Sequence, residues 1–256
     1  MKLATWNVNS IRARLERVVA WVEQHRPDVL CLQETKVSDD LFPADELRAL
    51  GYEVAFHGQR TYNGVAILSR TPLADVRRGF GDGDDDAQAR LISATVGGVR
   101  VLSVYVPNGE AVGSDKYAYK LGWMDRLRRH LATQVGPDVP LALCGDFNVA
   151  PAPMDVYDPK AWEGHVLFSA DERAALARIT DTSLVDLIRT MHPDEPMFTW
   201  WDYRMLAFPK GRGLRIDHLL VTPALAARTK ACGVDRESRK GKQPSDHAAV
   251  WMEYRE

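Results

Sequence analysis

The chain has 256 residues and a formal net charge of −2, with 45% hydrophobic and 27% charged residues. This balance is typical of a globular protein and excludes a disordered tail, a collagen-like chain and a coiled coil. The near-zero charge argues against a protein that coats nucleic acid through bulk positive charge. The length fits either one large α/β or β domain or two small ones.

The sequence shows no export signal and no membrane-spanning segment. No apolar stretch approaches the roughly 20 residues that span a bilayer, and the N-terminus turns polar before a signal-peptide core can form. Cys31, Cys144 and Cys232 are widely spaced. This spacing argues against a disulfide framework or a zinc site, so we expect buried free thiols, no membrane association and a cytoplasmic location.

The N-terminal segment predicts a strand, a helix and a second strand. Leu3–Val8 reads as the first strand, and Asn9 or Ser10 then caps the helix. Pro27 ends the helix, and Asp28–Leu32 is a compact apolar strand. The apolar face of the helix follows helical spacing and consists of Ile11, Leu15, Val18, Val19 and Val22.

The rest of the chain contains more predicted strands than helices. The strands are Tyr52–His57, Gly64–Ser69, Leu91–Val96, Val99–Val106, Pro140–Gly145, Arg215–Val221, Cys232–Asp235 and Ala248–Tyr254. The helices are Pro43–Leu50, Ser114–Thr133, Ala170–Ala177 and Leu184–His192. A solvated turn is expected where Asp82, Asp84, Asp85 and Asp86 gather. Short turns between neighbouring strands favour mixed or antiparallel sheets covered by helices.

Polar side chains fall near the ends of several predicted strands. They are Asn7, Glu34, Tyr105, Asp146 with Asn148, Asp217, and Asp246 with His247. If these ends converge, they form a carboxylate-rich pocket with one histidine. Carboxylate and amide oxygens suit magnesium or manganese better than zinc, and magnesium in such sites usually also meets a substrate phosphate. The pattern therefore predicts metal-assisted hydrolysis of a phosphate ester.

Each of these residues also has a simpler interpretation. Glu34 fits a surface charge at a strand end, and Asp146 fits a helix cap. Asp217 is harder to explain in this way, because a carboxylate buried in an apolar strand is costly without a partner. His247 is a natural partner for it, since an aspartate orients an imidazole. The residues taken together make the simpler interpretations improbable.

Seven segments in order along the chain resemble the exodeoxyribonuclease III family, the bacterial abasic-site endonucleases of the endonuclease/exonuclease/phosphatase superfamily. They are Trp6-Asn7-Val8-Asn9, Leu32-Gln33-Glu34, Tyr62-Asn63-Gly64-Val65-Ala66, Tyr105-Val106-Pro107-Asn108-Gly109, Gly145-Asp146-Phe147-Asn148, Leu214-Arg215-Ile216-Asp217 and Ser245-Asp246-His247. The resemblance covers essentially the whole chain. It implies a single domain over residues 1–256, a four-layer α/β sandwich of two packed mixed sheets flanked by helices, and a pseudo-twofold relation between halves.

The resemblance also implies an activity and its requirements. Family members are magnesium-dependent enzymes, for which manganese can substitute, that cleave DNA at abasic sites. They also act as 3′→5′ exonucleases and as 3′-phosphatases or phosphodiesterases on blocked 3′ ends. Double-stranded DNA with such lesions is therefore the expected partner, and a monomer is the expected state.

Carried onto this sequence, the resemblance assigns roles to the polar residues. Glu34 is the principal metal ligand. The wider set of metal ligands is Asn7, Glu34, Asp146, Asn148, Asp246 and His247. Asp146 orients or deprotonates the attacking water, Asn148 holds that water or stabilises the transition state, and Tyr105 binds the phosphate or donates a proton. His247, oriented by Asp217, contacts the scissile phosphate. The resemblance leaves open which of Asp146, Tyr105 and His247 moves each proton.

A second group of residues is expected to hold DNA. Trp200 is expected to form a wall of the pocket for a flipped-out sugar, while Trp201 lies in the core. Contacts to phosphates are expected to position the duplex without reading sequence, so activity should fall with salt. The candidates are Arg12, Arg14, Arg17, Tyr62, Asn63, Asn108, Arg204, Lys210, Arg212 and Lys240.

One residue departs from the family pattern. Small residues are common at the position before an aromatic beside the sugar pocket, and here Leu167 precedes Phe168. We hypothesise that Leu167 narrows the pocket and shifts activity from abasic-site incision toward trimming of 3′ ends.

Two other functions fit part of the pattern. A superfamily phosphatase acting on a phosphoinositide or sphingomyelin would share Glu34, Asp146, Asn148 and His247. It should lack the segment from Trp200 to Tyr203 and carry an apolar membrane-contacting loop, and the sequence shows no such loop. A catalytically dead scaffold would have lost a catalytic residue, and none is missing.

The bulk charge conceals an uneven distribution. Residues 204–242 contain ten basic and three acidic residues, a net charge of +7, so the remainder of the chain carries −9. The sequence therefore allows a protein that grips one damaged site through a local basic loop and an acidic, metal-binding pocket.

Overall fold

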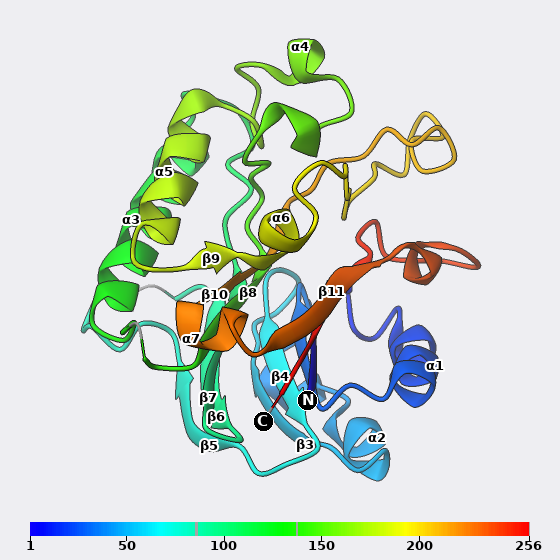
Figure 1. Cartoon of the computed structure of the whole chain (residues 1–256). Coiled ribbons are helices and arrows are strands. Elements are labelled where there is room, and N and C mark those ends of the chain that lie inside the picture. The colour runs from blue at the N-terminus through cyan, green and yellow to red at the C-terminus, as the bar shows by residue number, and fades with distance from the viewer. Residues whose placement is uncertain (85–86, 137, 256) are drawn as a thin grey trace.

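A computed structural model describes residues 1–84, 87–136 and 138–255, and its core is formed by two six-stranded sheets (Figure 1). The first sheet has the order β11 (Thr229–Asp235), β12 (Ala249–Tyr254), β1 (Lys2–Asn7), β2 (Val29–Gln33), β4 (Val65–Ser69) and β3 (Glu53–His57). The second has the order β5 (Ala74–Arg78), β6 (Leu91–Val96), β7 (Val99–Tyr105), β8 (Leu141–Asp146), β10 (Asp217–Val221) and β9 (Val185–Asp186).

The two sheets repeat the same pattern of pairing. In the first sheet β1 and β2 are parallel, and the other neighbours are antiparallel. In the second sheet β7 and β8 are parallel, and the other neighbours are again antiparallel. The parallel pair occupies the same place in both strand orders. This repetition agrees with the expected pseudo-twofold relation between halves.

Helices cover the outer face of each sheet, as Figure 1 shows on its two sides. On the first sheet lie α1 (Leu15–His25) and α2 (Ala44–Ala49), and on the second lie α3 (Asp115–Ala132) and α5 (Ala170–Thr180). Shorter helices are α4 (Pro159–Trp162), α6 (Leu187–Met191) and α7 (Pro223–Ala226), with 3-10 turns at Asp39–Leu41, Pro153–Asp155 and Arg236–Arg239.

The alternation of side chains along each strand creates the layers. Leu3 of β1 packs between the sheets, whereas Ala4 faces the helices α1 and α2. Leu102 of β7 likewise packs under α3 and α5, while Val101 faces the other sheet. The expected four-layer sandwich of two mixed sheets flanked by helices is therefore confirmed.

The three cysteines are free and buried, as expected, with Cys31 and Cys144 both in the core between the sheets. Among the described residues, no helix has the length and apolar character needed to cross a membrane.

The first helix begins later than the sequence predicts. The α1 helix starts at Leu15, and neither Asn9 nor Ser10 caps it. Both residues have positive φ values, 45° and 85°. Backbone hydrogen bonds from Ser10 N to Glu34 O (2.7 Å) and from Ile11 N to Thr35 O (3.1 Å) tie this turn to the chain that follows β2. The helix therefore cannot begin until the chain has left those partners.

Two strands escaped the sequence analysis. The β5 strand has the sequence Ala-Asp-Val-Arg-Arg, which lacks an apolar face because it is an exposed edge strand. The predicted helix Leu184–His192 instead opens with β9, after which Asp186 caps α6 by accepting a hydrogen bond from Arg189 N (3.2 Å). In the predicted acidic turn, Asp85 and Asp86 lie outside the described residues.

Candidate active site

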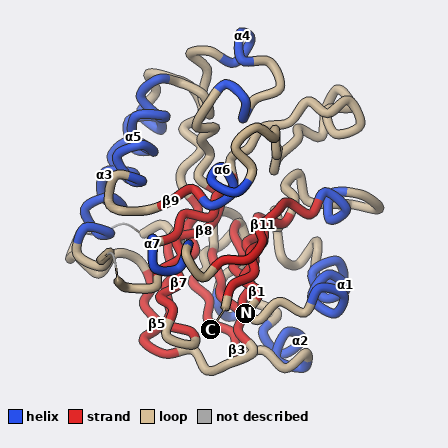
Figure 2. Tube along the Cα trace, viewed as in Figure 1, coloured by secondary structure: helices blue, strands red, loops and turns tan. Residues whose placement is uncertain are grey.

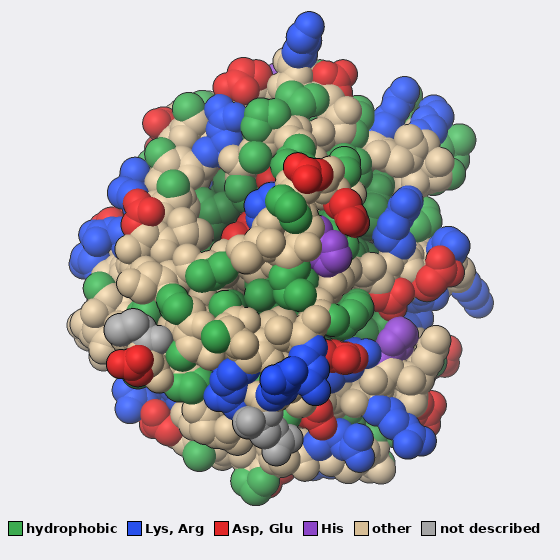
Figure 3. Space-filling model, viewed as in Figure 1, with side chains coloured by type: hydrophobic (Ala, Val, Ile, Leu, Met, Phe, Trp, Pro, Cys, Tyr) green, Lys and Arg blue, Asp and Glu red, His purple; other side chains and the backbone are tan. Residues whose placement is uncertain are grey.

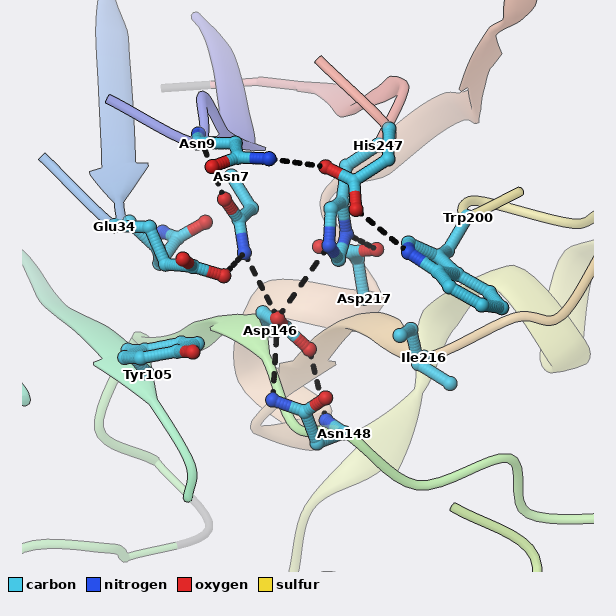
Figure 4. Close-up of polar contacts among 12 residues, drawn as sticks. Asn7, Asn9, Glu34, Tyr105, Asp146, Asn148, Trp200, Ile216, Asp217 and His247 are labelled. Carbon is cyan, nitrogen blue, oxygen red and sulfur yellow. Dashed lines mark hydrogen bonds and ion pairs between the residues drawn. The ribbon is translucent and has the colours of Figure 1, made fainter. Parts of the chain in front are cut away.

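The predicted polar residues meet at one edge of the two facing sheets (Figure 4). Asn7 ends β1 in register with Gln33 of the parallel β2, so Glu34 follows at the same edge. Tyr105 ends β7 in register with Asp146 of the parallel β8. The antiparallel β10 begins at this edge, which places Asp217 opposite Asp146, and His247 precedes β12 on the other sheet. Figure 2 shows loops extending from this edge.

Three of these side chains form a group suited to a cation. Ligand atoms of Glu34, Asp146 and His247 all lie within 4.8 Å of one another. The Asn7 amide joins two of them, because its Nδ2 donates to Glu34 Oε1 (2.8 Å) and to Asp146 Oδ2 (2.9 Å). The structure thus brings the predicted principal ligand to within 4.8 Å of the predicted water-activating carboxylate, with the Asn7 amide bonded to both.

Asp146 is almost fully buried and is held by the turn that follows it. The backbone N of Asn148 donates to Asp146 Oδ1 (2.8 Å), and Asn148 Nδ2 approaches Asp146 Oδ2 (3.3 Å). This return of the chain requires a positive φ of 51° at Asn148, a conformation that asparagine tolerates better than most residues. Burial raises the pKa of Asp146 to about 7; the His247 charge opposes this rise, whereas Asp217 and Glu34 reinforce it.

His247 is oriented by Asp217 as the sequence predicts. His247 Nδ1 lies 2.8 Å from Asp217 Oδ2, and its Nε2 lies 3.7 Å from Asp146 Oδ2. Burial opposes the charged imidazolium, but Asp217 and Asp146 outweigh it and raise the pKa of His247 to about 10. Thr199 Oγ1 donates to the same Asp217 oxygen (2.6 Å) and so fixes the carboxylate. The geometry presents a cation with an N–H at Nε2 to the pocket.

Tyr105 closes the other side of the pocket. Desolvation, together with the charges of Glu34 and Asp146, raises the pKa of Tyr105 well above its ordinary value. The Arg90 guanidinium lies 4.9 Å from the centre of the Tyr105 ring and opposes this rise. The phenol therefore stays protonated at neutral pH and can donate a hydrogen bond or a proton.

Asp246 lies beside this group, with both of its oxygens already engaged. Asn9 Nδ2 donates to Asp246 Oδ1 (3.0 Å), and Trp200 Nε1 donates to Asp246 Oδ2 (3.0 Å). Asn9 Oδ1 in turn accepts from Lys36 Nζ (2.6 Å), which also pairs with Glu34 Oε2 (2.7 Å). Hydrogen bonds thus connect the carboxylate group to the Trp200 ring.

Trp200 forms one wall of an apolar patch next to the polar site. It packs with Leu167, Leu214 and Ile216, and Figure 4 shows its ring beside Ile216 and facing the carboxylates. Trp201 instead lies in the core, 1% exposed, as expected. Leu167 belongs to the same apolar cluster and is buried, and its φ of 78° is a left-handed backbone conformation.

Comparison with known proteins supports the relationship that the site suggests. The sequence profile of the Endonuclease/Exonuclease/phosphatase family matches residues 4–247. The chain belongs to this family.

Similar proteins include exodeoxyribonuclease III of Haemophilus influenzae, which is 36% identical over 267 residues and is aligned over 100% of both chains. A solved structure of the 3′ phosphatase NExo from Neisseria, bound to a product DNA hairpin, superposes with a TM-score of 0.97 and 45% identity, covering 100% of this chain and 99% of that chain. An AP endonuclease from Archaeoglobus fulgidus gives a TM-score of 0.97 and 42% identity, covering 99% of both chains. The predicted resemblance to exodeoxyribonuclease III is thereby confirmed.

Most of the residues that we expected to contact DNA have exposed side chains. They are Arg12, Tyr62, Asn108, Arg204, Lys210 and Arg212. Asn63 differs, because its side chain is buried and its Nδ2 donates to Gln59 (3.0 Å) and Gln88 (3.3 Å). Asn63 therefore shapes the turn that presents the neighbouring Tyr62. Figure 3 shows lysine and arginine side chains at the ends of the loops that project on the right-hand side of Figure 1.

Two other arginines that were predicted to contact phosphates instead donate hydrogen bonds to groups of the protein itself. Arg14 donates to Asn9 O and to Tyr203 Oη (3.2 Å). Arg17 donates to three backbone carbonyls of the loop that precedes His247, at Ser238, Lys240 and Lys242. Both arginines thus stabilise loops beside the candidate active site.

Sequence reasoning missed several residues of the site. Lys36 and Asn9 complete the polar chain from Glu34 to Asp246, and Thr199 fixes Asp217. Each lies within two residues of Glu34, Asn7 or Trp200, which is the signal that could have identified it.

The loop between Trp201 and Gly213 also carries an exposed apolar tip, Met205 at 76% and Leu206 at 66% exposure. A short apolar pair beside Arg204 gives no hydropathic signal in the sequence.

Proposed function

We propose that this protein is a magnesium-dependent DNA repair nuclease that hydrolyses phosphodiester bonds at abasic sites and phosphate esters at the 3′ ends of duplex DNA. One observation carries the proposal: the Glu34, Asp146 and His247 group lies directly beside the Trp200 wall, below exposed basic loops. The names of the similar proteins, an exodeoxyribonuclease III, an AP endonuclease and a 3′ phosphatase, support it.

The donor atoms at the site fit a hard divalent cation. Glu34 and Asp146 offer carboxylate oxygens, and the group found among the described residues contains no cysteine, which suits magnesium or manganese. Asn7 turns its Nδ2 toward these two carboxylates, and its Oδ1 accepts from the backbone N of Asn9 (3.0 Å). Glu34 would be the principal ligand, with Asp146 and Asn7 beside it. A bound magnesium would neutralise charge on the phosphate. His247 lies in the same group; its Nδ1 is 2.8 Å from Asp217 Oδ2, and we assign its Nε2 to the phosphate.

Asp146 and Asn148 are placed to act on the attacking water. Water loses a proton as its oxygen forms a bond to phosphorus, and the Asp146 carboxylate accepts that proton or orients the water. The charge of a bound cation would keep Asp146 ionised, as a general base requires. Asn148 Nδ2, held between Val106 O (3.0 Å) and Asp146, keeps the turn fixed during the reaction.

His247 and Tyr105 are placed to meet negative charge on the phosphate. The His247 imidazolium donates from Nε2 to a non-bridging oxygen as charge accumulates in the transition state. As the ester bond to the leaving oxygen breaks, that oxygen takes up a proton, and the Tyr105 phenol, which its raised pKa keeps protonated, is placed to donate it. Asp217 keeps the imidazole charged and in place, and it does not itself touch the phosphate.

The apolar wall is suited to an extruded sugar. An abasic nucleotide has no base pair to lose, so turning it out of the duplex costs little. The exposed basic residues Arg12, Arg204, Lys210 and Arg212 would contact the phosphate backbone on either side, with Tyr62 and Asn108 at the rim. The apolar tip of Met205 and Leu206 would enter a groove opened by the missing base.

Leu167 occupies the position where it would limit this pocket. It belongs to the apolar cluster that includes Leu214 and Ile216 and against which Trp200 packs, the groups that would line the sugar site. We therefore propose that removal of 3′ phosphates and trimming of 3′ ends exceed incision at internal abasic sites.

We also propose that residues 1–256 fold as one domain, act as a monomer and work in the cytoplasm. The pairing of β1 with β12 joins the two ends of the chain in one sheet, and the shared core between the sheets supports the single domain. The three free thiols support a reducing compartment.

One assay tests this function. The protein is incubated with a duplex containing one abasic site and with a duplex ending in a 3′ phosphate, each with magnesium and with a chelator. We expect magnesium-dependent product from both duplexes and none from a soluble phosphoinositide. Activity on the phosphoinositide alone would contradict the proposal, and activity that persists in the chelator would contradict the role of the metal.

A further inference from the structure

A fully buried ion pair lies behind the active site, between the two helices that cover the second sheet. Lys120 on α3 and Glu172 on α5 are both 0% exposed, and Lys120 Nζ donates to Glu172 Oε1. The two residues are 52 positions apart in the sequence. Neither takes part in the reaction described above.

Lys120 supports the two asparagine loops of the site. Its Nζ also donates to Asn148 O (2.7 Å) and to Asn108 O (3.0 Å), so one ammonium group holds the main chains of both loops. The side chains of these asparagines are joined as well, because Asn108 Nδ2 donates to Asn148 Oδ1 (3.2 Å). Gly109 leaves room for this arrangement, since a Cβ there would lie 3.1 Å from Lys120 Cδ.

Glu172 supports the apolar wall. Its Oε1 accepts from the backbone N of Leu167 (3.0 Å), and its Oε2 accepts from the backbone N of Ser169 (3.0 Å). These bonds hold Leu167 in its left-handed conformation and fix the start of α5 through a capping box. A single ion pair therefore connects the Asn108 and Asn148 loops to the apolar wall that includes Leu167.

Stability alone gives no reason for a charged pair at this place. Burial of two charges costs much of what their attraction returns, and well-packed apolar residues of similar volume often serve as well or better. Burial lowers the pKa of Lys120, although the Glu172 carboxylate opposes this. Apolar residues cannot replace the hydrogen bonds of this pair, because the Lys120 ammonium donates to the two loops and the Glu172 carboxylate accepts from the start of α5 and from Leu167.

We propose that the Lys120–Glu172 pair is a positioning unit, which sets the distance between the Asn108 and Asn148 loops and the Leu167 wall. It thereby sets the ratio of abasic-site incision to removal of 3′ phosphates. The inference rests on the proposed function, since it concerns the substrate preference of the same site.

The test is a double variant, Lys120→Met with Glu172→Leu, which removes both charges and leaves neither partner unpaired. We expect the variant to fold with a lower melting temperature, because no lone charge is buried but Asn148 O, Leu167 N and Ser169 N each lose a hydrogen-bond partner. We expect kcat on the preferred DNA to fall about 10- to 100-fold, with KM little changed, because the loops move relative to each other. The ratio of the two activities should shift at least threefold.

A matched control is available on the same helix. Lys116 of α3 pairs with Glu110 (3.0 Å), but both side chains are well exposed, at 70% and 61%. The Lys116→Met variant should leave kcat and the activity ratio unchanged. Lys120→Arg, which keeps the charge and several donors, should recover part of the wild-type kcat.

A folded double variant with wild-type kcat and wild-type activity ratio would overturn the proposal. If the double variant fails to fold by circular dichroism, Glu172→Gln replaces it, because the amide oxygen still accepts from Leu167 N; failure of both to fold would assign the pair to stability and also overturn the proposal. A wild-type protein inactive on both duplexes would instead refute the proposed function itself.

Discussion

The indole Nε1 of Trp200 donates a 3.0 Å hydrogen bond to Asp246 Oδ2. This bond joins the aromatic wall to the polar chain through Asn9 and Lys36 that ends at Glu34. The pKa of Asp246 is lowered even though burial opposes ionisation, because His247, Trp200 and Asn9 stabilise the charge. The ring plane of Trp200 is thus fixed by the same network that surrounds the cation group.

Replacing Trp200 should separate the contribution of its ring, which forms a wall of the pocket, from that of its N–H, which donates to Asp246. Trp200→Ala removes the wall and should reduce abasic-site incision by about 10- to 100-fold, a range expected for lost pocket contacts. Cleavage of a free 3′ phosphate should fall less, because that reaction needs no extruded sugar. Steady-state rates on the two duplexes measure the difference.

Trp200→Phe is the matched control, because it keeps a smaller aromatic ring and loses the N–H that donates to Asp246. We expect an intermediate loss of incision, since Asp246 Oδ2 then has no donor and the ring can rotate. Equal losses on both substrates in the Ala variant would count against a pocket role for Trp200.

Asp146→Asn should uncouple binding from turnover. The amide keeps the shape of the carboxylate but accepts no proton, so kcat should fall by about 10²- to 10⁴-fold, the usual worth of a general base. The Kd for the abasic duplex, measured by fluorescence anisotropy, should stay near the wild-type value. Near-normal turnover would remove the role assigned to Asp146.

Leu167→Gly should widen the sugar pocket. Glycine adopts the φ of 78° without strain, which offsets part of the cost of about 2–5 kcal/mol for deleting a large buried side chain. We expect abasic-site incision to rise about tenfold or more relative to 3′-phosphate removal. Leu176→Ala, a truncation in the core under α5, should lower stability and leave the activity ratio unchanged.

Robust incision by the wild type, equal to its 3′-phosphate removal, would refute the narrowing role of Leu167.

The sequence predicted the structure correctly where neighbouring residues in the chain determine it. The segments Leu3–Val8 and Pro140–Gly145 were predicted as the strands that became β1 and β8, and the polar residues at their ends, Asn7 and Asp146, were correctly expected to meet. The residues that the sequence misplaced depend on partners far along the chain. Asn9 looks like a helix cap, but its side chain contacts Asp246, 237 positions away.

Other features gave weak signals for a physical reason. The β5 edge strand has charges where a buried strand has apolar residues, and edge strands need no apolar face. The Lys120–Glu172 pair reads as two surface charges on amphipathic helices, and only the packing of α3 on α5 buries it. Sequence patterns report the local environment of a residue and do not report which distant element will cover it.

The His247–Asp217 pair should make stability depend on pH in a defined direction. The pKa of His247 is raised from 6.5 to about 10 in the folded protein, so the folded state binds more protons than the unfolded state between these values. The stabilisation is therefore fully present below about pH 6.5 and is lost as the pH rises toward 10. From pH 7 to pH 9, with a chelator present, the free energy of unfolding should fall by up to about 1.4 kcal/mol per pH unit. In Asp217→Asn the imidazole loses its principal charge partner, so the slope measured by urea denaturation should flatten. A wild-type stability that stays level or rises over this range would contradict a charged His247 in the folded protein.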